Sequence, residues 1–547
     1  MGSTLENSYD YIIIGSGTAG CVLANRLSKD PANSVCLIEA GPPDTSPLVH
    51  VPAAVGALLF HRKMGWGYKT APQATLGGRE IPVPRGRVLG GCSSTNGMVY
   101  FRGQPQDFDD WSGMGNTGWS YREVLPYFIR SEKNEQFGDS PYHGADGPMV
   151  VSDVNRYNPL IDTFLAAAFS LGYPKCEDFN AADPVGFNTR QGNIHNGRRV
   201  SGVTAFLGPV KYRQNLKIMT NTLVTRILLE QGRAVGLEMN VAGTTHKLAA
   251  RKEIILAAGT FGSPQILMLS GIGDGRELQS LGIVVQHDLP EVGRNFHDHP
   301  AIGVIMKTEN TESYGLSLKA FPRGVWNVIE YLFFRRGPLA SNLFEAMGFL
   351  RTTDGLDRPD IQFVFQPATR PTPRFPIPVG HGYAMNPVLL YPKSRGRVTL
   401  ASPDPHAMPV IDPNILSDEA DMETMIRAIK ISRKILNAPA FDRYASVERL
   451  PGAERQDDAA LRDYVREYVA TVHHPVSTCR MGGDAAAVVD PELRVRGIEG
   501  LRVADASIFP QIIGGNTNAA VVMVAEKASD LILGLPAPEP FDPADDN

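Results

Sequence analysis

The chain has 547 residues, which is too long for one ordinary domain and predicts two to four. Hydrophobic residues make up 43% and charged residues 20%, a profile that is typical of a globular enzyme and excludes a disordered or fibrous chain. The formal net charge is -5 and no basic cluster is visible, so nucleic acid is not expected as a partner.

The N-terminal residues and the cysteines indicate in which cellular compartment the protein is expected. Residues 1–9 are polar and lack a basic segment followed by an apolar core, which argues against a signal peptide. No uncharged apolar run approaches the roughly 18 residues of a membrane span. The cysteines are odd in number and show no metal-type pairing, so they predict a reducing, cytoplasmic environment. They are Cys21, Cys36, Cys92, Cys176 and Cys479.

Residues 9–41 predict a strand, a helix and a second strand. Between the first strand and the helix lie Gly15, Gly17 and Gly20, in the spacing G-x-G-x-x-G. The first glycine makes the turn, the second lets the backbone approach a phosphate, and the third lets the helix pack on the strand. The helix N-terminus then offers amides and a dipole to a pyrophosphate.

A second apolar run ends in Glu39, which lies 19 residues after Gly20. A carboxylate there accepts hydrogen bonds from a ribose diol and disfavours a 2′-phosphate. Strand, glycine turn, helix, strand and acid together predict dinucleotide binding. The choice between FAD and NAD stays open at this point.

Further elements follow in chain order. Residues 42–84 are rich in Pro and Gly and predict either a lid over the cofactor or a plain surface loop. Residues 86–100 are rich in Gly and Ser, so their backbone can approach a flat or charged group closely. Three short strands are expected at 216–219, 224–229 and 235–239, forming a small meander inserted in the first domain.

The amino-acid composition and the hydrophobic pattern change at about residue 301, which predicts a second domain. Prolines are frequent from there to residue 485, and alternating segments indicate a sheet with long loops. Residues 419–436 predict a helix on this sheet. Residues 325–334 predict an apolar, aromatic helix with basic ends. Core packing is its expected role, and the alternatives are lining an apolar channel or resting on a membrane surface.

Five stretches then match one family: 15–20 with Glu39, 86–103, 259–273, 473–482 and 503–518. In this order they resemble the glucose-methanol-choline (GMC) oxidoreductases, flavoproteins that oxidise alcohols. Within this family, the overall sequence most resembles the bacterial alcohol and choline dehydrogenase-like members. The resemblance implies an α/β fold (α+β overall), with a Rossmann-like FAD-binding domain and a substrate domain made of a sheet plus helices.

The resemblance also implies a division of the chain. The FAD-binding domain is expected to comprise residues 1–155, 205–300 and 488–535, and the substrate-binding domain 156–204 and 301–487. Residues 536–547 are Pro-rich and acidic and are expected to be a disordered tail.

The cofactor implied by the resemblance is FAD. Glu39 is expected on the adenosine ribose, Val224 near the adenine, and residues 87–99 along the pyrophosphate and flavin. Some relatives attach flavin covalently through a histidine where this chain has Thr95, so the FAD is expected to be non-covalent. The expected FAD-binding residues are Gly15, Gly17, Thr18, Ala19, Gly20, Glu39, Arg87, Val88, Gly91, Asn96, Gly97, Met98, Val99, Val224, Asp505, Ala506 and Thr517.

His474 matches the catalytic histidine of the family and is expected to act as the general base, because an imidazole suits removal of a hydroxyl proton. Asn516 falls on the second catalytic position and is expected to hold the substrate oxygen. Asn518 is the alternative for that role. His297 and His299 predict a polar loop rather than a metal site, and no metal is expected.

The resulting prediction is oxidation of an apolar aliphatic or aromatic primary alcohol to an aldehyde. Molecular oxygen or a quinone-type acceptor would take the electrons, and the oligomeric state and peripheral membrane contact stay open. The alternatives are a hydroxynitrile lyase, a fatty-acid photodecarboxylase or a non-catalytic FAD-binding protein.

Overall fold

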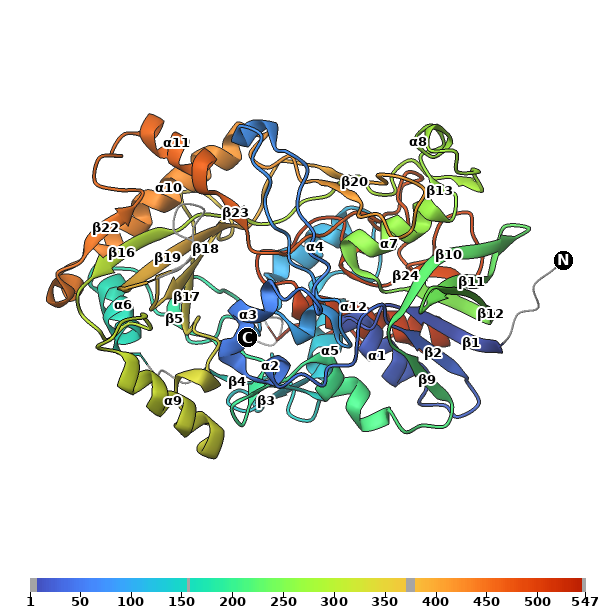
Figure 1. The fold of residues 1–547 in the computed structure, drawn as a ribbon, viewed down its shortest axis with the longest axis horizontal. Coiled ribbons are helices and arrows are strands. Elements are labelled where there is room, and N and C mark those ends of the chain that lie inside the picture. Colours follow the sequence, from blue (N-terminus) through green and yellow to red (C-terminus); the bar gives the residue numbers. More distant parts are fainter. Residues whose placement is uncertain (1–6, 155–157, 370–378, 544–547) are drawn as a thin grey trace.

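A computed structural model of the protein describes residues 7–154, 158–369 and 379–543. Figure 1 shows two sheets in separate halves of the molecule, one around β1, β2 and β12 and the other around β16 to β19. Each sheet has seven strands and its own apolar core. The division of the chain at particular residues stays a prediction.

The first sheet is mixed. Its parallel part runs β24-β12-β1-β2-β9, and β11 and β10 add to it as an antiparallel ribbon beside β12. The central strand β1 over residues 10–14 and its neighbour β2 are buried on both faces, which explains why these segments read as nearly continuous apolar runs. The strands are β1 (Asn7–Ile14), β2 (Val35–Ile38), β9 (Leu216–Met219), β10 (Thr222–Glu230), β11 (Arg233–Val241), β12 (Thr244–Leu256) and β24 (Leu501–Val503).

The expected meander is wrong in its first strand. Leu216 pairs with Val35 in a parallel ladder, so β9 belongs to the nucleotide-binding sheet, while β10 and β11 form a ribbon with β12. Neighbouring strands in sequence usually pair, but the buried parallel edge of β2 offers more apolar contact to this strand.

Two helices, α1 (Thr18–Leu27) and α12 (Asn518–Leu533), pack together beside the first sheet. They are joined at their N-termini, where Thr18 Oγ1 donates to Asn518 Oδ1 at 2.7 Å. Helix α12 begins at Asn518, two residues after Asn516. Asn516 is left in the preceding loop and Asn518 is used within the fold.

The second sheet is antiparallel, in the order β17-β18-β19-β15-β23, with β16 pairing β19 and β22. Helix α10 (Glu419–Leu436) has the expected bounds and packs on β19, next to α6 (Pro159–Ser170) and α11 (Asp458–Tyr468). The strands are β15 (Pro300–Ala301), β16 (Val304–Thr308), β17 (Ala346–Leu350), β18 (Ile361–Gln366), β19 (His381–Leu389), β22 (Val447–Leu450) and β23 (Ala470–Thr471).

The long segment 42–84 forms an arm between the two halves (Figure 1, blue). Its strands bridge at Lys69 and Pro82, and its tip reaches the second half of the molecule. There Gln73 Nε2 donates to Asp412 Oδ1 at 3.0 Å, and Arg79 Nη2 donates to the Val469 carbonyl at 2.6 Å. The arm is therefore a connection between the two sheets and not a free surface loop.

The remaining elements are shorter or lie at the edges. The helices are α2 (Pro47–His50), α3 (Val55–Leu59), α4 (Pro105–Gly113), α5 (Tyr121–Ser131), α7 (Gly259–Leu269), α8 (Gly275–Ser280) and α9 (Phe321–Phe334). The strands are β3 (Glu132–Asn134), β4 (Met149–Asp153), β5 (Gly186–Thr189), β6 (Gln191–Gly192), β7 (Ile194–His195), β8 (Arg198–Arg199), β13 (Ile272–Gly273), β14 (His287–Asp288), β20 (Arg397–Thr399) and β21 (Val410–Asp412).

Helix α9 corrects the expectation of core packing. It forms as the sequence predicts, but most of its apolar side chains face solvent: Phe333 is 76% exposed and Trp326 59%, while Tyr331 is buried. The side turned to the protein carries Asn327, Glu330 and Tyr331, so the helix packs inward by its polar stripe.

The end of the chain is held as far as Phe541, whose amide donates to the Arg122 carbonyl at 2.8 Å and whose ring packs against the first core. The rest of the expected disordered tail, residues 544–547, lies outside the described residues, as do residues 1–6. In the described part of the chain, every helix is too short or too polar to span a bilayer.

Candidate flavin and catalytic site

The three glycines of the turn have different steric surroundings. Gly15 has a φ of +98°, and a Cβ on Gly20 would lie 1.9 Å from the Gly15 carbonyl oxygen. Gly17 is open: a Cβ there meets nothing nearer than Ala257 O at 3.9 Å. Gly15 and Gly20 therefore serve the fold, whereas Gly17 leaves room beside the helix N-terminus.

That room fits a pyrophosphate. Gly17, the residue before α1, makes no side-chain capping bond, and the first turn holds no acidic residue, so the helix-end amides and dipole favour an anion. Gly91 approaches from the opposite side, since a Cβ on it would lie 2.8 Å from the Gly17 Cα. Thr18 and Ala19 form the first turn between them.

Glu39 lies at the carboxyl end of β2, as the fingerprint predicts. Its Oε2 accepts from the Ser16 amide and hydroxyl at 3.1 and 2.7 Å, and its Oε1 accepts from the Gly41 amide at 2.8 Å. Burial raises the pKa of this carboxyl. The Thr222 amide donates to the Glu39 carbonyl at 2.9 Å, which brings the start of β10, and Val224 with it, to the same edge.

The loop 87–99 is fixed by Arg199. This buried guanidinium donates to the Val49 and Ser93 carbonyls and, through Nη1, to the Asn96 carbonyl and Oδ1 at 2.7 and 2.8 Å. Burial without a carboxylate partner lowers the pKa of Arg199 to about 9. The Asn342 side chain donates to the Gly97 carbonyl from the second half of the molecule.

The other residues of this loop that are predicted to bind FAD differ in which of their groups are available to a cofactor. Val88 is buried in a small apolar cluster, so only its backbone is available to a cofactor. Met98 has a φ of +55°, and its carbonyl accepts from the Asn193 amide at 2.9 Å. Val99 bridges Gly192, and Arg87 stacks over Trp66 with its buried Nε unpartnered by any described group.

The C-terminal stretch closes the same edge of the sheet. Asp505 Oδ2 accepts from the Gly259 amide at 2.8 Å and from Ser263 Oγ at 2.6 Å, at the start of α7. The Ala506 carbonyl accepts from the Ser477 amide, and Thr517 precedes α12. The Asp505 side chain thus serves the fold, and its backbone with Ala506 and Thr517 is what remains for a cofactor.

His474 and Asn516 come together although they lie 42 residues apart. Asn516 Nδ2 is 3.2 Å from His474 Nε2, and Asn516 Oδ1 accepts from Gln362 Nε2 at 3.3 Å. On its other side, His474 Nδ1 is 3.0 Å from His299 Nδ1. Asp298 Oδ1 accepts from the His474 amide at 2.7 Å and holds the backbone of that loop.

The direction of these hydrogen bonds sets the protonation of His474. His299 Nε2 lies 3.1 Å from the Ile513 carbonyl, which only accepts, so Nε2 carries the proton. Burial lowers the pKa of His299 to about 4, so this ring is neutral and its Nδ1 accepts. His474 Nδ1 therefore donates, and the lone pair of its Nε2 points toward the Asn516 amide.

Burial also lowers the pKa of His474 well below its ordinary value, with smaller contributions from His299, His473 and Arg85. The ring is neutral at physiological pH and is ready to accept a proton at Nε2.

His299, Asp298 and Arg199 are functional neighbours that the sequence reasoning missed. The motif His297-Asp298-His299 indicated only a polar loop, and no local pattern pairs it with residue 474. Among the described residues no group of three or more His, Cys, Asp or Glu is arranged to hold a metal ion.

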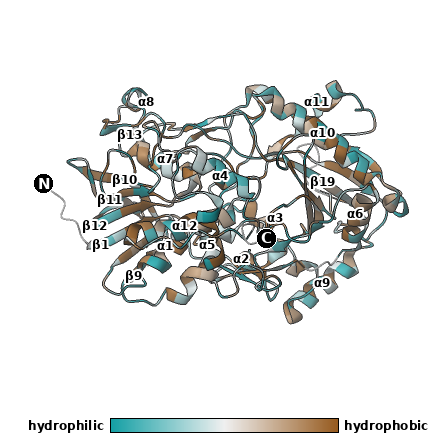
Figure 2. Ribbon diagram, turned by 180° about the vertical axis from the view of Figure 1, so that it is seen from behind, coloured by the Kyte–Doolittle hydropathy of each residue, from teal (hydrophilic) through white to brown (hydrophobic). Residues whose placement is uncertain are grey.

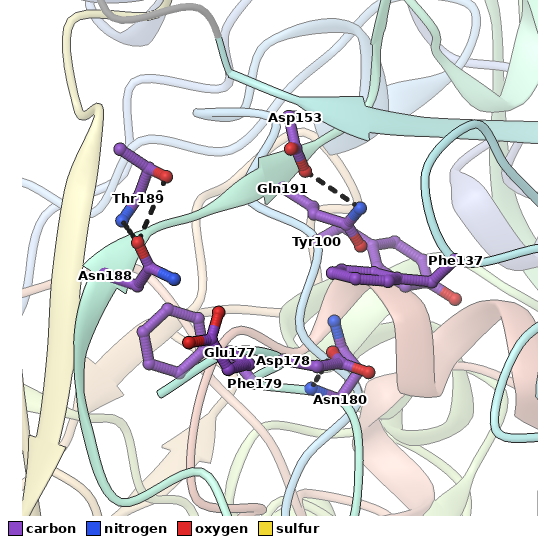
Figure 3. A pocket seen from close by; sticks show the side chains of 10 residues that line it. All are labelled: Tyr100, Phe137, Asp153, Glu177, Asp178, Phe179, Asn180, Asn188, Thr189 and Gln191. Carbon is purple, nitrogen blue, oxygen red and sulfur yellow. Dashed lines mark hydrogen bonds between the residues drawn. The ribbon is translucent and has the colours of Figure 1, made fainter. Parts of the chain in front are cut away.

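A small pocket lies elsewhere, lined by Tyr100, Asp178 and Gln191 among others (Figure 3). Its volume is about 40 Å³, which suits water rather than a substrate. Its lining residues include neither His474 nor Asn516, so it lies apart from the candidate site.

A Rossmann-type sheet with a partly buried histidine–asparagine pair on nearby loops is the arrangement of a flavin-dependent oxidoreductase. Comparison with known proteins agrees. Residues 9–301 and 392–525 match two family models described as GMC oxidoreductase. The chain belongs to the GMC oxidoreductase family, uses FAD and acts on CH–OH groups. The expected family, fold class and cofactor are confirmed.

Relatives cover nearly the whole chain. It is 43% identical over 529 residues to an alcohol dehydrogenase (acceptor) of Pseudomonas putida, with 96% of each chain covered. It is also 43% identical over 529 residues to an oxygen-dependent choline dehydrogenase of Brucella canis, and the alignment covers 96% of this chain and 95% of that one. Pyridoxine 4-oxidase from Mesorbium loti is 33% identical with a TM-score of 0.86, covering 95% and 98%. Formate oxidase of Aspergillus oryzae is 28% identical with a TM-score of 0.90, covering 97% and 99%.

The glycine turn generates a paired prediction. Gly20→Ala is expected to lower the thermal midpoint of the FAD-free protein by about 3 °C or more, because α1 must move away from the turn. Gly17→Ala is expected to keep that midpoint within about 1 °C and to weaken FAD binding instead. Scanning fluorimetry and FAD titration measure the two effects. An equal loss of midpoint in both variants would contradict the assignment.

The histidine chain generates a second prediction. Because the pKa of His474 is lowered, the rate of anaerobic flavin reduction by an alcohol should stay level from about pH 8 down to about pH 6. His299→Leu removes the acceptor of the His474 Nδ1 proton, so the rate should fall about tenfold or more. It also removes the hydrogen bond that stabilises the protonated form of His474, so the pKa of His474 should fall further and the acid limb should move to lower pH.

His299→Asn is the matched variant, because an amide can both donate to the Ile513 carbonyl and accept from His474. It is expected to keep the rate within a few-fold. If both variants had the wild-type pH profile, His299 would be a packing residue only.

Proposed function

We propose that the protein oxidises a primary alcohol to an aldehyde, with His474 as the base and Asn516 as the residue that holds the alcohol oxygen. The observation that supports this most strongly is the hydrogen-bonded chain Ile513–His299–His474–Asn516. It leaves an unprotonated imidazole nitrogen beside an amide donor, which are the two groups that an alcohol hydroxyl needs.

The roles follow from these atoms. The hydroxyl proton goes to His474 Nε2, and the oxygen accepts from Asn516 Nδ2, whose orientation is set by Gln362. The resulting positive charge on His474 is held by its Nδ1–H bond to His299. FAD, when bound, supplies the hydride acceptor. The chain itself orients the alcohol and takes its proton.

We infer that the FAD is held by Gly17, Thr18, Ala19, Glu39, residues 87–99, Val224 and the 505–517 stretch, with Gly15 and Gly20 shaping the turn. Thr95 stands at the position of a histidine linkage, which supports non-covalent attachment. All five cysteines are free, which supports a reducing compartment such as the cytoplasm.

The surroundings of Asn516 favour an apolar alcohol. Phe101 lies directly against Gly515, where a Cβ would come within 2.1 Å of its ring. Met347 and Phe349 belong to the same buried apolar cluster as Phe101.

The base is tested by His474→Ala. Anaerobic flavin reduction by the alcohol is expected to slow by on the order of 10²-fold or more, while FAD stays bound, because only the proton acceptor is lost. His195→Ala, which removes an exposed histidine paired with Glu135, is the control and should keep the wild-type rate. A normal rate for His474→Ala with verified FAD content would remove His474 from the mechanism.

The substrate class is tested by an anaerobic panel of 1-octanol, benzyl alcohol, choline and glucose, scored by loss of the flavin absorbance. The two apolar alcohols are expected to bleach the flavin fastest. Faster bleaching by choline or glucose would contradict the apolar site, and no bleaching by any alcohol would favour a non-oxidising family activity. Admission of air then separates the acceptors: fast reoxidation indicates oxygen and slow reoxidation a quinone-type acceptor.

A further inference from the structure

The apolar and polar faces of helix α9 are oriented in the opposite way to those of an ordinary surface helix. Its apolar side chains stand outward and its polar stripe faces the protein. Tyr331 donates from its hydroxyl to the Gly197 carbonyl at 3.0 Å. Under the helix lies a hollow of about 270 Å³ with polar walls that include Asn158, Glu312 and Glu330. The helix is therefore attached by polar contacts, and its apolar face is not part of either core.

The outward face is continuous and large for a single helix. Trp326 is 59% exposed, Leu332 62% and Phe334 64%, and the exposed Leu318 lies three residues before the helix. The 14 residues of α9 extend over about 21 Å. Figures 1 and 2 both place the helix at the periphery of the molecule, where a flat surface can reach it. Apolar area of this kind usually marks an interaction site.

Cations border this face at both ends. Lys319 and Arg323 lie at the N-terminal end and Arg335 and Arg336 at the other, and all four are exposed. Within the described residues none of the four forms a salt bridge, but Arg323 donates to the Thr311 and Ser313 carbonyls and Arg335 lies over the Tyr331 ring at 5.0 Å, which leaves Lys319 and Arg336 as the cations most available to a partner. Glu330, the acidic residue of the helix, faces inward toward Gly337. A protein of net charge -5 thus presents a locally basic, apolar face.

We propose that α9 docks on an anionic lipid bilayer, with its apolar side chains in the headgroup region and the cations Lys319 and Arg336 on lipid phosphates. Exposed Trp, Phe and Leu beside Lys and Arg are the composition of helices that lie in the membrane interface. Such a helix lies in the interface plane and buries its apolar face by about 5–10 Å, without crossing the bilayer.

A second copy of the chain fits this face less well. Pairing two α9 faces about a two-fold axis would bring the cations of one copy against those of the other, which costs affinity. A face about 21 Å long and about 10 Å wide is also far smaller than the roughly 800 Å² per partner of a stable interface. An anionic surface satisfies both the charge and the apolar area.

Docking there also deepens the proposed function, on which this step rests. The chain runs from the end of α9 to Asn342 within eight residues, and Asn342 contacts the Gly97 loop. A bilayer bound at α9 would therefore deliver apolar alcohols and lipid-soluble acceptors to the side of the molecule that carries the expected flavin loop.

The test is vesicle co-flotation of the FAD-loaded enzyme. Vesicles of phosphatidylcholine with about one third phosphatidylglycerol should bind it, and pure phosphatidylcholine should bind it about tenfold less. The triple variant Trp326→Ser/Leu332→Ser/Phe333→Ser and the pair Lys319→Gln/Arg336→Gln should each lower binding about tenfold. The control Tyr212→Ser/Val284→Ser, which removes exposed apolar groups elsewhere, should bind like the wild type.

FAD content and thermal midpoint establish that each variant is folded. Absence of wild-type binding, or equal binding by the triple variant, would overturn the proposal. So would a dimer in light scattering that the triple variant abolishes, because α9 would then be a self-association face. The inactive His474→Ala variant should bind vesicles like the wild type, so that a failure of the catalytic proposal and a failure of lipid docking are seen separately.

Discussion

The candidate catalytic site depends on one hydrogen bond between two imidazoles, that of His299, which is buried, and that of His474, which is partly buried. His299 and His474 are neutral because burial disfavours their charged forms, and a bond between two neutral rings works only if one ring accepts and the other donates. The Ile513 carbonyl decides which, because it takes the proton of His299 Nε2. Every later property of the site, including the free lone pair of His474 and its contact with Asn516, follows from that carbonyl.

This chain of contacts spans elements that are remote in sequence but converge at one edge of the parallel sheet. Strand β1 ends at the glycine turn, β2 at Glu39, and β12 runs toward Gly259, which is tied to Asp505. Because parallel strands end at the same edge, a nucleotide there touches all three loops at once. The second sheet contributes Gln362 and Asn342, so the site is completed only where the two halves meet.

Particular residues show where sequence reasoning was sufficient. The glycine spacing predicted the turn correctly because the positive φ of Gly15 and the close approach of Gly20 to the Gly15 carbonyl exclude residues with a Cβ at these two positions. The bounds of α10 followed from its apolar period and its acidic start.

Strand β9 was misplaced because its partner, β2, lies nearly two hundred residues earlier and no local signal reports parallel pairing. His299 was set aside because a His-x-His pattern in a loop carries no information about a ring 175 residues away.

The sequence by itself determined the family and the cofactor and predicted the residues that we propose carry the chemistry, since all of these rest on local motifs whose backbone geometry permits few alternatives. The tertiary structure decided what depends on neighbours from far along the chain. It set the protonation of His474 through His299, placed Asn516 in the loop and Asn518 in the fold, and turned the apolar face of α9 outward. Helical periodicity identifies an apolar face, but only the packing of the other elements determines whether that face meets a core or the solvent.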